Sequence, residues 1–240
     1  MKIIAVIPAR FSSSRFPGKP LAMILGKPMI QWVYEAVKKI DCISDVIVAT
    51  DDERIVDCVT SFGGTASITG DCNCGTDRVY QAVKDIQCDL VINVQGDEPL
   101  ITEEAIKAVI KAFDEEGVVV STLKTKINTV DEAKDINAVK VITDASDDAI
   151  YFSRSLIPYN RTRTDISYYR AIGVYCFTKE FLKKYVEMPR GPLECSESVE
   201  QLRVIEHGYK MKVIETDYKG FGVDIPDHIQ IVESIISSGR

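Results

Sequence analysis

Three short, predominantly apolar runs in the first half of the chain, at residues 2–7, 45–50 and 89–95, constrain the fold most strongly. A run of this kind, without regular alternation of apolar and polar residues, is typical of a strand that is buried on both faces of a sheet. The segments between and after these runs are helix-like at residues 27–40, 53–62 and 76–86 and after Thr102, with a short strand at 65–69. This alternation of strands and helices predicts right-handed crossovers and an α/β fold with a doubly wound, mainly parallel sheet.

The second half of the chain has a different pattern, in which strand-like segments are separated by polar loops. These segments are residues 118–125, 138–143, 149–152 and 172–177, with a polar tract at 160–165. We interpret residues 118–188 as strands that extend the sheet, plus an excursion that covers the site or pairs with another subunit. The remaining elements are a helix at 199–207, a strand at 210–215 and a helix at 226–236 that has Pro226 in its first turn. We therefore expect a single domain that spans residues 1–240.

The first apolar run leads directly into a loop that carries the cations Arg10, Arg15 and Lys19 together with three serines and a glycine. Backbone N–H groups of such a loop can surround phosphate oxygens while the cations neutralise their charge. The pattern favours a polyanionic ligand, although a solvated basic loop has the same composition. The loop has neither the glycine-rich dinucleotide fingerprint nor the phosphate-loop spacing, so neither of those two classes is favoured.

Aspartates stand at the predicted carboxyl ends of the strands, where parallel sheets bind their ligands. Asp51 follows the second apolar run, Asp97 follows the third, and Asp224 lies just before the closing helix. Asp97 and Asp224, meeting beside a phosphate-binding loop, would form an oxygen-rich Mg²⁺ site whose shell is completed by phosphate oxygens and water. Simpler roles stay open: an exposed turn residue for Asp97, and a helix cap for Asp51 or Asp224.

Composition and charge argue against several classes of protein. The chain of 240 residues has 29 Lys and Arg against 36 Asp and Glu, and its formal net charge of −7 argues against nucleic acid as the main partner. No apolar run approaches the roughly 20 residues that span a bilayer, and no signal-like segment precedes the first strand. Seven scattered cysteines indicate reduced thiols, and Cys72 with Cys74 lacks the further ligands of a zinc site. We therefore expect a cytoplasmic protein without stable membrane association.

Several motifs, in the expected order over nearly the whole chain, resemble those of the 3-deoxy-manno-octulosonate cytidylyltransferases, or CMP-Kdo synthetases. They are Ile7-Pro8-Ala9-Arg10, the run from Ser14 to Leu21, Gly75-Thr76-Asp77-Arg78, the run from Val94 to Pro99, Asn137-Ala138-Val139-Lys140, Tyr151-Phe152-Ser153-Arg154, Glu200-Gln201-Leu202-Arg203 and Gly222-Val223-Asp224. Agreement over this many motifs is far more specific than any single loop. The resemblance implies a Rossmann-like nucleotidyltransferase fold.

The resemblance also implies a reaction. Enzymes of this family join CMP from CTP to the anomeric hydroxyl of 3-deoxy-manno-octulosonate (Kdo), a 2-keto-3-deoxy sugar acid, and release pyrophosphate, for lipopolysaccharide or capsule synthesis. In-line attack on the α-phosphorus needs positioning and charge neutralisation more than a protein nucleophile. By the same resemblance the enzyme would use Mg²⁺ and would form a homodimer through residues 118–188.

Individual residues receive roles from the same resemblance. Lys19, Arg15 and Asp97 would be catalytic, and Asp97 with Asp224 would bind Mg²⁺. The nucleotide-binding residues would be Arg10, Ser13, Arg15, Lys19, Asp51, Cys74 and Arg78. The sugar-binding residues would be Gln95, Arg154, Tyr175, Glu200 and Gln201, with an arginine holding the substrate carboxylate. Plainer roles are a core position for Tyr175 and a solvated helix face for Glu200 and Gln201.

Two positions depart from the family pattern. Cys74 stands where the family usually has serine, and a thiol is a weaker hydrogen-bond partner than a hydroxyl. Ala171 stands where the family commonly has histidine, so a donor that could touch the sugar is absent. The acceptor alternatives to Kdo are therefore its 8-amino analogue, 8-amino-3,8-dideoxy-octulosonate, and a nine-carbon sialic-type acid. A catalytically silent nucleotide-binding subunit is a further alternative, which the two metal-type carboxylates disfavour.

Overall fold

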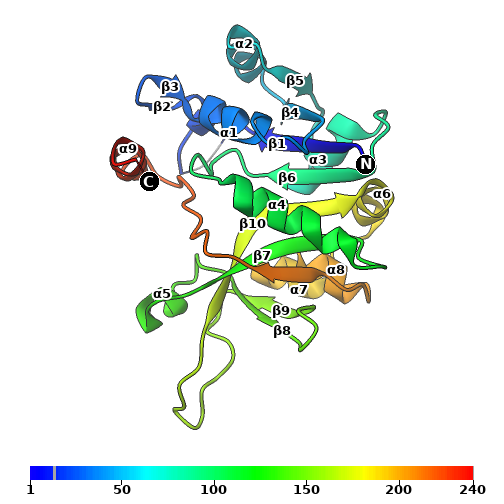
Figure 1. Cartoon of the computed structure of the whole chain (residues 1–240), viewed down its shortest axis with the longest axis vertical. Coiled ribbons are helices and arrows are strands. Elements are labelled where there is room, and N and C mark those ends of the chain that lie inside the picture. Colours follow the sequence, from blue (N-terminus) through cyan, green and yellow to red (C-terminus); the bar gives the residue numbers. More distant parts are fainter. Residues whose placement is uncertain (13–14, 240) are drawn as a thin grey trace. The chain divides into compact units, whose positions relative to one another are not determined.

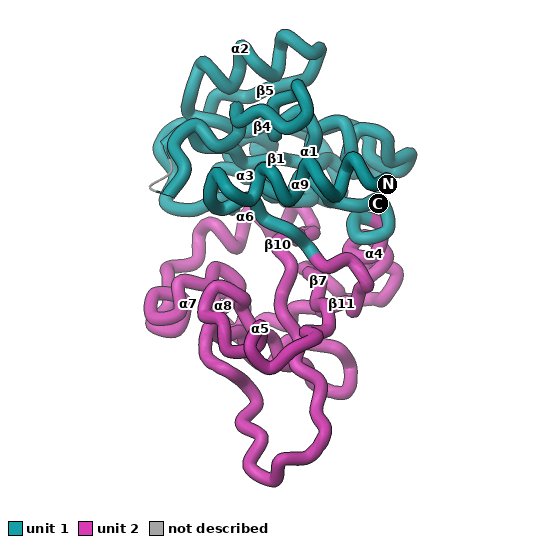
Figure 2. The backbone as a smooth tube through the Cα atoms, turned by 90° about the vertical axis from the view of Figure 1, so that its left-hand side faces the viewer, with its two compact units in different colours: residues 1–106, 220–240 teal, residues 107–219 magenta. Residues whose placement is uncertain are grey.

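The computed structural model describes residues 1–12 and 15–239, which divide into two compact units (Figure 2). Unit 1 comprises Met1–Ile106 and Gly220–Arg240, and unit 2 comprises Lys107–Lys219. Within the described part of the chain, no helix is both long enough and apolar enough to cross a membrane.

Unit 1 is built on a four-stranded parallel sheet (Figure 1). Its elements are β1 (Ile3–Ala9), the 3-10 helix η1 (Lys19–Leu21), the hairpin strands β2 (Met23–Ile24) and β3 (Lys27–Pro28), α1 (Met29–Lys38), β4 (Asp45–Thr50), α2 (Glu53–Ser61), β5 (Thr65–Ile68), α3 (Gly75–Val83), β6 (Leu90–Val94), the start of α4 (Glu103–Lys111), and α9 (His228–Ser237). The strands lie in the order β6-β1-β4-β5. Because each link between neighbouring parallel strands contains a helix, the predicted doubly wound sheet is confirmed in this unit.

The apolar runs of the sequence form the core of unit 1. Strands β4 and β6 are buried along almost their whole length, and β1 is buried at every position except Pro8. Helices α1 and α3 both pack on β1 and β4 and lie on opposite faces of the sheet (Figures 1 and 2). Helix α1 directs Ile30, Val33 and Val37 into this core. The carboxyl ends of β1, β4 and β6 therefore form a rigid edge from which polar loops depart.

Unit 2 has a mixed sheet, as expected for a strand-rich second half. Its elements are η2 (Ala112–Asp114), β7 (Val120–Lys126), α5 (Val130–Lys134), β8 (Lys140–Thr143), β9 (Ala149–Ser153), β10 (Tyr169–Thr178), α6 (Lys179–Glu187), α7 (Pro192–Glu197), α8 (Leu202–Glu206) and β11 (Lys212–Glu215), with the last residues of α4. The pairs β10–β7, β10–β8 and β8–β9 are antiparallel, and β11–β7 is parallel.

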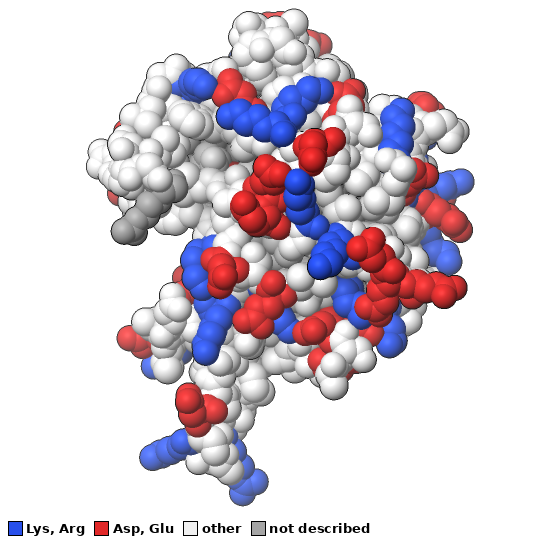
Figure 3. Space-filling model, in the orientation of Figure 1, with Lys and Arg blue, Asp and Glu red and all other residues white. Residues whose placement is uncertain are grey.

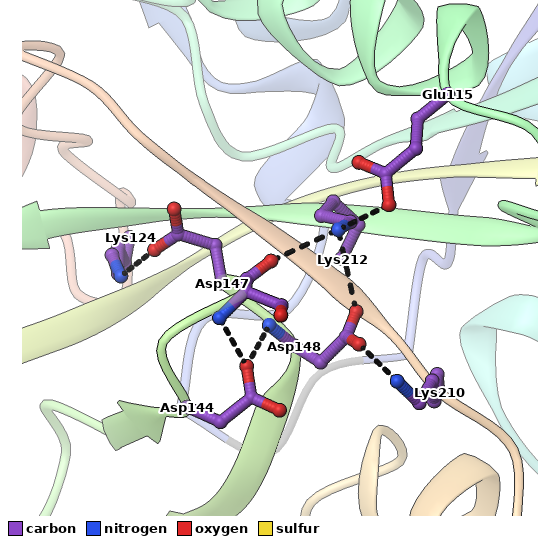
Figure 4. Close-up of polar contacts among 8 residues, drawn as sticks. Glu115, Lys124, Asp144, Asp147, Asp148, Lys210 and Lys212 are labelled. Atoms are coloured by element: carbon purple, nitrogen blue, oxygen red, sulfur yellow. Dashed lines mark hydrogen bonds and ion pairs between the residues drawn. The ribbon is translucent and has the colours of Figure 1, made fainter.

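A network of ion pairs attaches the β8–β9 hairpin to β11 (Figure 4). The Lys212 ammonium donates to Glu115 Oε1 at 2.8 Å and to the Ser146 carbonyl at 2.9 Å, and it lies 3.6 Å from Asp148 Oδ1. The other oxygen of Asp148 accepts from Lys210 at 2.8 Å. Hydrogen bonding to Glu115 raises the pKa of Lys212 above its usual value. The mostly buried Lys212 side chain thus compensates its desolvation through several charge-assisted contacts.

Residues 179–187, for which no helix or strand was predicted, form α6: the Thr178 hydroxyl caps it by accepting from the Phe181 N–H at 3.1 Å, and Phe181 and Tyr185 are buried one turn apart. The prediction that Pro226 lies in the first turn of the closing helix is wrong: Pro226 lies in the turn before α9, because the helix has Asp227 as its N-cap. The other predicted helices and strands are present, with ends shifted by a few residues.

Candidate active site

The N-terminal cationic loop ends at Gly18, whose backbone is fixed from two sides. Gly18 has φ 70°, a left-handed conformation, and a Cβ there would lie 3.2 Å from the Phe11 ring. Its N–H donates to the Phe11 carbonyl at 2.9 Å. Glycine is therefore required for the chain to close the loop and start η1 at Lys19.

The Phe11 ring also contacts Arg54 at the start of α2. The Arg54 guanidinium carbon lies 3.3 Å from the ring centroid, and the guanidinium also donates to both oxygens of Asp52. This hydrogen bonding holds the pKa of Asp52 below its usual value. Asp52 is also the N-cap of α2, since its Oδ1 accepts from the Arg54 N–H at 3.0 Å. The helix-cap alternative for Asp51 is therefore wrong.

Asp97 reaches the cationic loop because β6 and β1 end side by side. Gly96 follows β6, and a Cβ at this position would lie 3.0 Å from the Pro8 carbonyl oxygen, so only glycine allows this close approach. The next residue, Asp97, forms an ion pair with the Lys19 ammonium.

Asp224 reaches the same place through the packing of the C-terminal segment. Val223 is fully buried in a cluster with Ile24, Met29 and Val232, which joins the hairpin, α1 and α9. The Val223 N–H donates to the Asp97 carbonyl at 2.9 Å. Two residues earlier in the chain, Phe221 donates its N–H to the Glu98 carboxylate at 3.0 Å. Backbone contacts therefore align the segment 221–224 beside the Asp97 turn.

Two carboxylates and two cations consequently lie together in unit 1. Asp224 Oδ1 lies 2.8 Å from Arg15 Nη2 and 3.9 Å from the same Lys19 ammonium that pairs with Asp97. The side chains of Lys19, Asp97 and Asp224 are 16%, 29% and 40% exposed, so the group is open to a ligand. Neither plainer role fits: Asp97 is an ion-pair partner rather than a solvated turn residue, and the cap of α9 is Asp227.

The chemistry of these donors fits Mg²⁺ better than other common metals. Asp97 and Asp224 offer only oxygen, the element that Mg²⁺ prefers, and Mg²⁺ usually takes one or two carboxylates and fills its shell with phosphate oxygens and water. In the described residues there is no group of three or more His, Cys, Asp or Glu side chains arranged for a metal. A cation at this place would therefore depend on substrate oxygens.

The predicted nucleotide-binding residues occupy one edge of unit 1. Arg10 Nη2 donates to the Cys72 carbonyl at 3.3 Å. Arg78 is only 1% exposed and donates to Asp51 Oδ2 at 2.6 Å and to the Thr69 hydroxyl. The buried guanidinium therefore fixes Asp51 and the Thr69 hydroxyl. Ser13 lies outside the described residues.

Cys74 is the N-cap residue of α3, with an extended backbone, and its thiol makes no capping hydrogen bond. Serine is a strong N-cap residue, so the substitution removes a helix cap as well as altering a predicted nucleotide contact. Burial raises the pKa of the neighbouring Cys72 thiol. The seven cysteines are thiols rather than disulfides within the described chain, as predicted.

The predicted sugar-binding residues are distributed over the two units. In unit 1, the Gln95 amide donates to Asn93 Oδ1 at 3.2 Å. In unit 2, Tyr175 is half-buried on β10, and Glu200 and Gln201 are half-buried immediately before α8 rather than on a solvated helix face. Arg154 follows β9 and donates to backbone carbonyls of the segment that precedes Glu200.

Three supporting residues were not predicted from the sequence. Glu98 belongs to the Val94–Pro99 motif but received no role, although an acidic residue directly after Asp97 was a usable sequence signal; in the structure its side chain is buried. Phe11 and Arg54 clamp the cationic loop, and their pairing depends on tertiary packing that no local pattern reveals. On the face of the molecule in Figure 3, basic and acidic side chains are interspersed, in keeping with the negative net charge.

Comparisons with known proteins show what the whole chain is similar to. Residues 4–214 match the family model described as cytidylyltransferase. A 3-deoxy-manno-octulosonate cytidylyltransferase of Solibacter usitatus is 45% identical over 240 residues, which cover 99% of this chain and 95% of that one. The mitochondrial 3-deoxy-manno-octulosonate cytidylyltransferase of Arabidopsis thaliana is 44% identical over 98% of this chain and 83% of its own length.

Solved structures give the same result. A CMP:2-keto-3-deoxy-manno-octonic acid synthetase in complex with CTP is 38% identical to this chain, with a TM-score of 0.95 and full coverage of both chains. A 4-diphosphocytidyl-2C-methyl-D-erythritol synthase from Anaerococcus prevotii is 18% identical, with a TM-score of 0.66 over 98% of this chain and 99% of that one, and therefore supports the fold alone. The predicted α/β nucleotidyltransferase fold is confirmed by these matches.

Proposed function

The chain belongs to the 3-deoxy-manno-octulosonate cytidylyltransferase family, and from this premise we propose that it transfers CMP from CTP to the anomeric hydroxyl of Kdo and releases pyrophosphate. It is an enzyme of the nucleotidyltransferase class. The observation that carries the proposal is the meeting of Asp97 and Asp224 at the Lys19 ammonium, at the end of the cationic loop.

The internal ion pairs prepare the site for a magnesium–nucleotide complex. In the structure, Arg15 pairs with Asp224 and Lys19 pairs with Asp97. Phosphate oxygens of a nucleotide would offer partners to Lys19 and Arg15, and the two carboxylates would then be available to hold Mg²⁺. This exchange of partners lowers the cost of desolvating each charge and explains why cations and carboxylates are interleaved.

The reaction itself needs alignment and charge neutralisation. The anomeric oxygen of the sugar forms a bond to the α-phosphorus, the bond from the α-phosphorus to the oxygen that bridges to the β-phosphate breaks, the hydroxyl proton passes to solvent water, and pyrophosphate departs. Lys19, Arg15 and Arg10 hold the phosphates, and Lys19 stabilises the charge that develops on the leaving group. Asp97 and Asp224 are the residues that would hold Mg²⁺. The bound ion would neutralise phosphate charge and lower the pKa of the attacking hydroxyl.

The sugar end of the reaction is assigned to Gln95 of unit 1 and to Tyr175, Glu200 and Gln201 of unit 2, in positions that match the family motifs. Ala171 on β10 replaces the family's common histidine and leaves an 8-amino acceptor as the alternative substrate. Pyrophosphate release from CTP and Mg²⁺, measured with Kdo, 8-amino-3,8-dideoxy-octulosonate and a sialic acid in parallel, tests the assignment. We expect the highest kcat/KM with Kdo; no release with any of the three would refute cytidylyl transfer to ulosonic acids.

We also propose that the enzyme is a homodimer that uses residues 118–188. Large apolar side chains are exposed in this region of unit 2, namely Val130, Ile136, Ile150 and Tyr159. Sedimentation analysis should give twice the chain mass, and the variant Ile150→Asp with Tyr159→Asp should sediment as a monomer. CTP as substrate and the thiol state of the cysteines support a cytoplasmic location.

A further inference from the structure

Glu200 and Gln201 are the last two residues of a sharp turn between α7 and α8, which we call the 197–201 turn (residues 197–201). Ser198, the second residue of this turn, has φ 52° and ψ 50°, a left-handed conformation that is unfavourable for a residue with a side chain. Only three residues separate the end of α7 from Gln201, the N-cap residue of α8. Contacts from outside the turn must therefore hold this conformation.

Arg154 supplies several of these contacts. Its Nε donates to the Glu197 carbonyl at 2.7 Å and its Nη2 donates to the Ser198 carbonyl at 3.3 Å. Its Nη1 donates to the Ile136 carbonyl at 3.0 Å, so each guanidinium nitrogen has a backbone partner. The edge formed by Nε and Nη2 is one of the two edges with which arginine can bind a carboxylate side-on, and here two carbonyls of the turn occupy it.

The backbone of Arg154 is fixed as firmly as its side chain. Its N–H donates to Glu197 Oε2 at 2.9 Å, and the Ser153 hydroxyl donates to Glu197 Oε1 at 2.6 Å. Its carbonyl accepts from the fully buried Lys140 ammonium at 2.7 Å, and burial lowers the pKa of Lys140. Because these contacts include a charged group in the interior, moving Arg154 toward a ligand would break several strong hydrogen bonds.

Tyr185 holds the other end of the turn. Its hydroxyl donates to the Glu200 carbonyl at 2.9 Å, and the side chain is 2% exposed. The Arg203 guanidinium lies 4.5 Å from the Tyr185 ring centroid and binds Glu194 with two hydrogen bonds of 2.7 and 2.8 Å. Arg203 and Glu194 are also buried, so the tyrosine ring rests on a rigid ion pair.

We propose that Arg154 and Tyr185 are positioning residues for sugar-acid binding: they fix the carbonyls of Glu197, Ser198 and Glu200, and thereby aim the side chains of Glu200 and Gln201. Arg154 then acts through the turn and is not the arginine that holds the substrate carboxylate. The inference rests on the proposed function, because Glu200 and Gln201 are its sugar-binding residues.

The test uses three variants of the full-length enzyme: Tyr185→Phe, Arg154→Lys and the matched control Tyr209→Phe. The Tyr209 hydroxyl is hydrogen-bonded to Lys184 and not to the 197–201 turn. Loss of the Tyr185 hydrogen bond should raise the KM for Kdo about three- to tenfold and leave the KM for CTP within about twofold. Tyr209→Phe should leave both values unchanged. Equal increases in both KM values for Tyr185→Phe, or no increase, would overturn the proposal.

A second readout separates positioning by Arg154 from direct binding. The kcat/KM ratio between Kdo and its uncharged C1 amide measures recognition of the carboxylate. Positioning predicts that Arg154→Lys lowers kcat/KM for both compounds and keeps their ratio. Collapse of the ratio toward one would show that Arg154 binds the carboxylate and would overturn its assignment here.

Amide hydrogen exchange supplies a readout that does not depend on turnover. Exchange at residues 197–201 should become faster in Tyr185→Phe and Arg154→Lys and stay unchanged in Tyr209→Phe. Unchanged exchange in the first two variants would overturn the proposed clamp even in an active enzyme. An inactive wild-type protein would contradict the proposed function, whereas the exchange result would still decide whether these residues hold the turn.

Discussion

The backbone N–H of Val223 donates a hydrogen bond of 2.9 Å to the carbonyl of Asp97. This single contact sets the relative position of the two aspartates, since Asp224 follows Val223 directly and the Val223 side chain is anchored in the apolar cluster with Met29 and Val232. The site of unit 1 is therefore built from backbone pairing and core packing. Its charged groups are held close together on this framework.

Replacing Lys19 by alanine should lower kcat by about two orders of magnitude or more, the range seen when one electrostatic stabiliser of a transition state is lost. Lys27→Ala is the matched control, because Lys27 pairs with Glu35 in the same unit. It should leave the rate unchanged. Steady-state pyrophosphate release measures both variants, and a Lys19→Ala enzyme within about threefold of wild type would contradict the role given to Lys19.

Variants of Asp51 and Asp52, which directly follow β4, should have different effects: one on nucleotide binding and the other on the capping of α2. Asp51→Asn removes the carboxylate partner of the buried Arg78 and should raise the KM for CTP about tenfold or more. Asp52→Ala removes the cap of α2 and should lower the free energy of unfolding by about 1 kcal/mol without changing the KM for CTP. Urea unfolding and CTP titration distinguish the two, and a larger KM effect at Asp52 would reverse the assignment.

Cys74→Ser should stabilise the protein. The serine hydroxyl can cap α3 where the thiol does not, and the expected gain in the free energy of unfolding is about 0.5–1 kcal/mol. Cys74→Ala, which also lacks a capping oxygen, is the control and should not give this gain. Equal stability of the serine and alanine variants in urea unfolding would show that the cap is not formed.

The turn at Asp144 gives unit 2 a measurable dependence on pH (Figure 4). Backbone N–H groups of Asp148 and then Ser146 hold the pKa of Asp144 below its usual value. A carboxyl whose pKa is lower in the folded state stabilises the fold above its unfolded-state pKa, and this stabilisation is lost as the pH falls through the folded-state pKa. Asp144→Asn should therefore be less stable than wild type at pH 7.

The stability difference between Asp144→Asn and wild type should narrow as the pH falls below about 4, where the wild-type carboxyl begins to take up its proton. Urea unfolding at several pH values measures this stability difference. Asp131→Asn, at an exposed ion pair with Lys134, should show only a small difference at every pH. If the difference in the free energy of unfolding between Asp144→Asn and wild type stayed constant with pH, the charge of Asp144 would not contribute to stability.

Much of the fold could be predicted because local pattern and tertiary role coincide in unit 1. The run 45–50 forms β4 at the predicted residues, since β-branched residues without polar interruption suit only a strand buried on both faces. The helix α6 was not predicted, because Phe181 and Tyr185 lie in a part of the sequence where strand-like segments predominate, although Thr178 is a typical residue at a helix start. The hairpin β2–β3 was not predicted, because strands of two residues are too short to show an alternation of apolar and polar residues.

The site was predicted in part, and the missing part depends on packing. Asp97 could be singled out because it directly follows a buried strand. For Asp51 the sequence allowed two roles, a ligand contact or a helix cap, because its neighbour Asp52 has the same side chain and can cap the helix equally well. Arg78 was predicted to meet the nucleotide, whereas its burial could only be seen in three dimensions. The clamp of Phe11 by Arg54 joins residues 43 positions apart, and no local rule predicts such a pair.

We propose that Asp97 and Asp224, 127 positions apart, work together with Mg²⁺ beside Lys19. The most direct test is pyrophosphate release from CTP and Kdo over a range of Mg²⁺ concentrations, for Asp97→Asn, Asp224→Asn and the control Asp45→Asn, with circular dichroism to verify folding. We predict that the first two variants fold normally but lose turnover at every Mg²⁺ concentration, and that the control keeps the wild-type Mg²⁺ dependence. Near-normal turnover in both Asp97→Asn and Asp224→Asn would contradict the account.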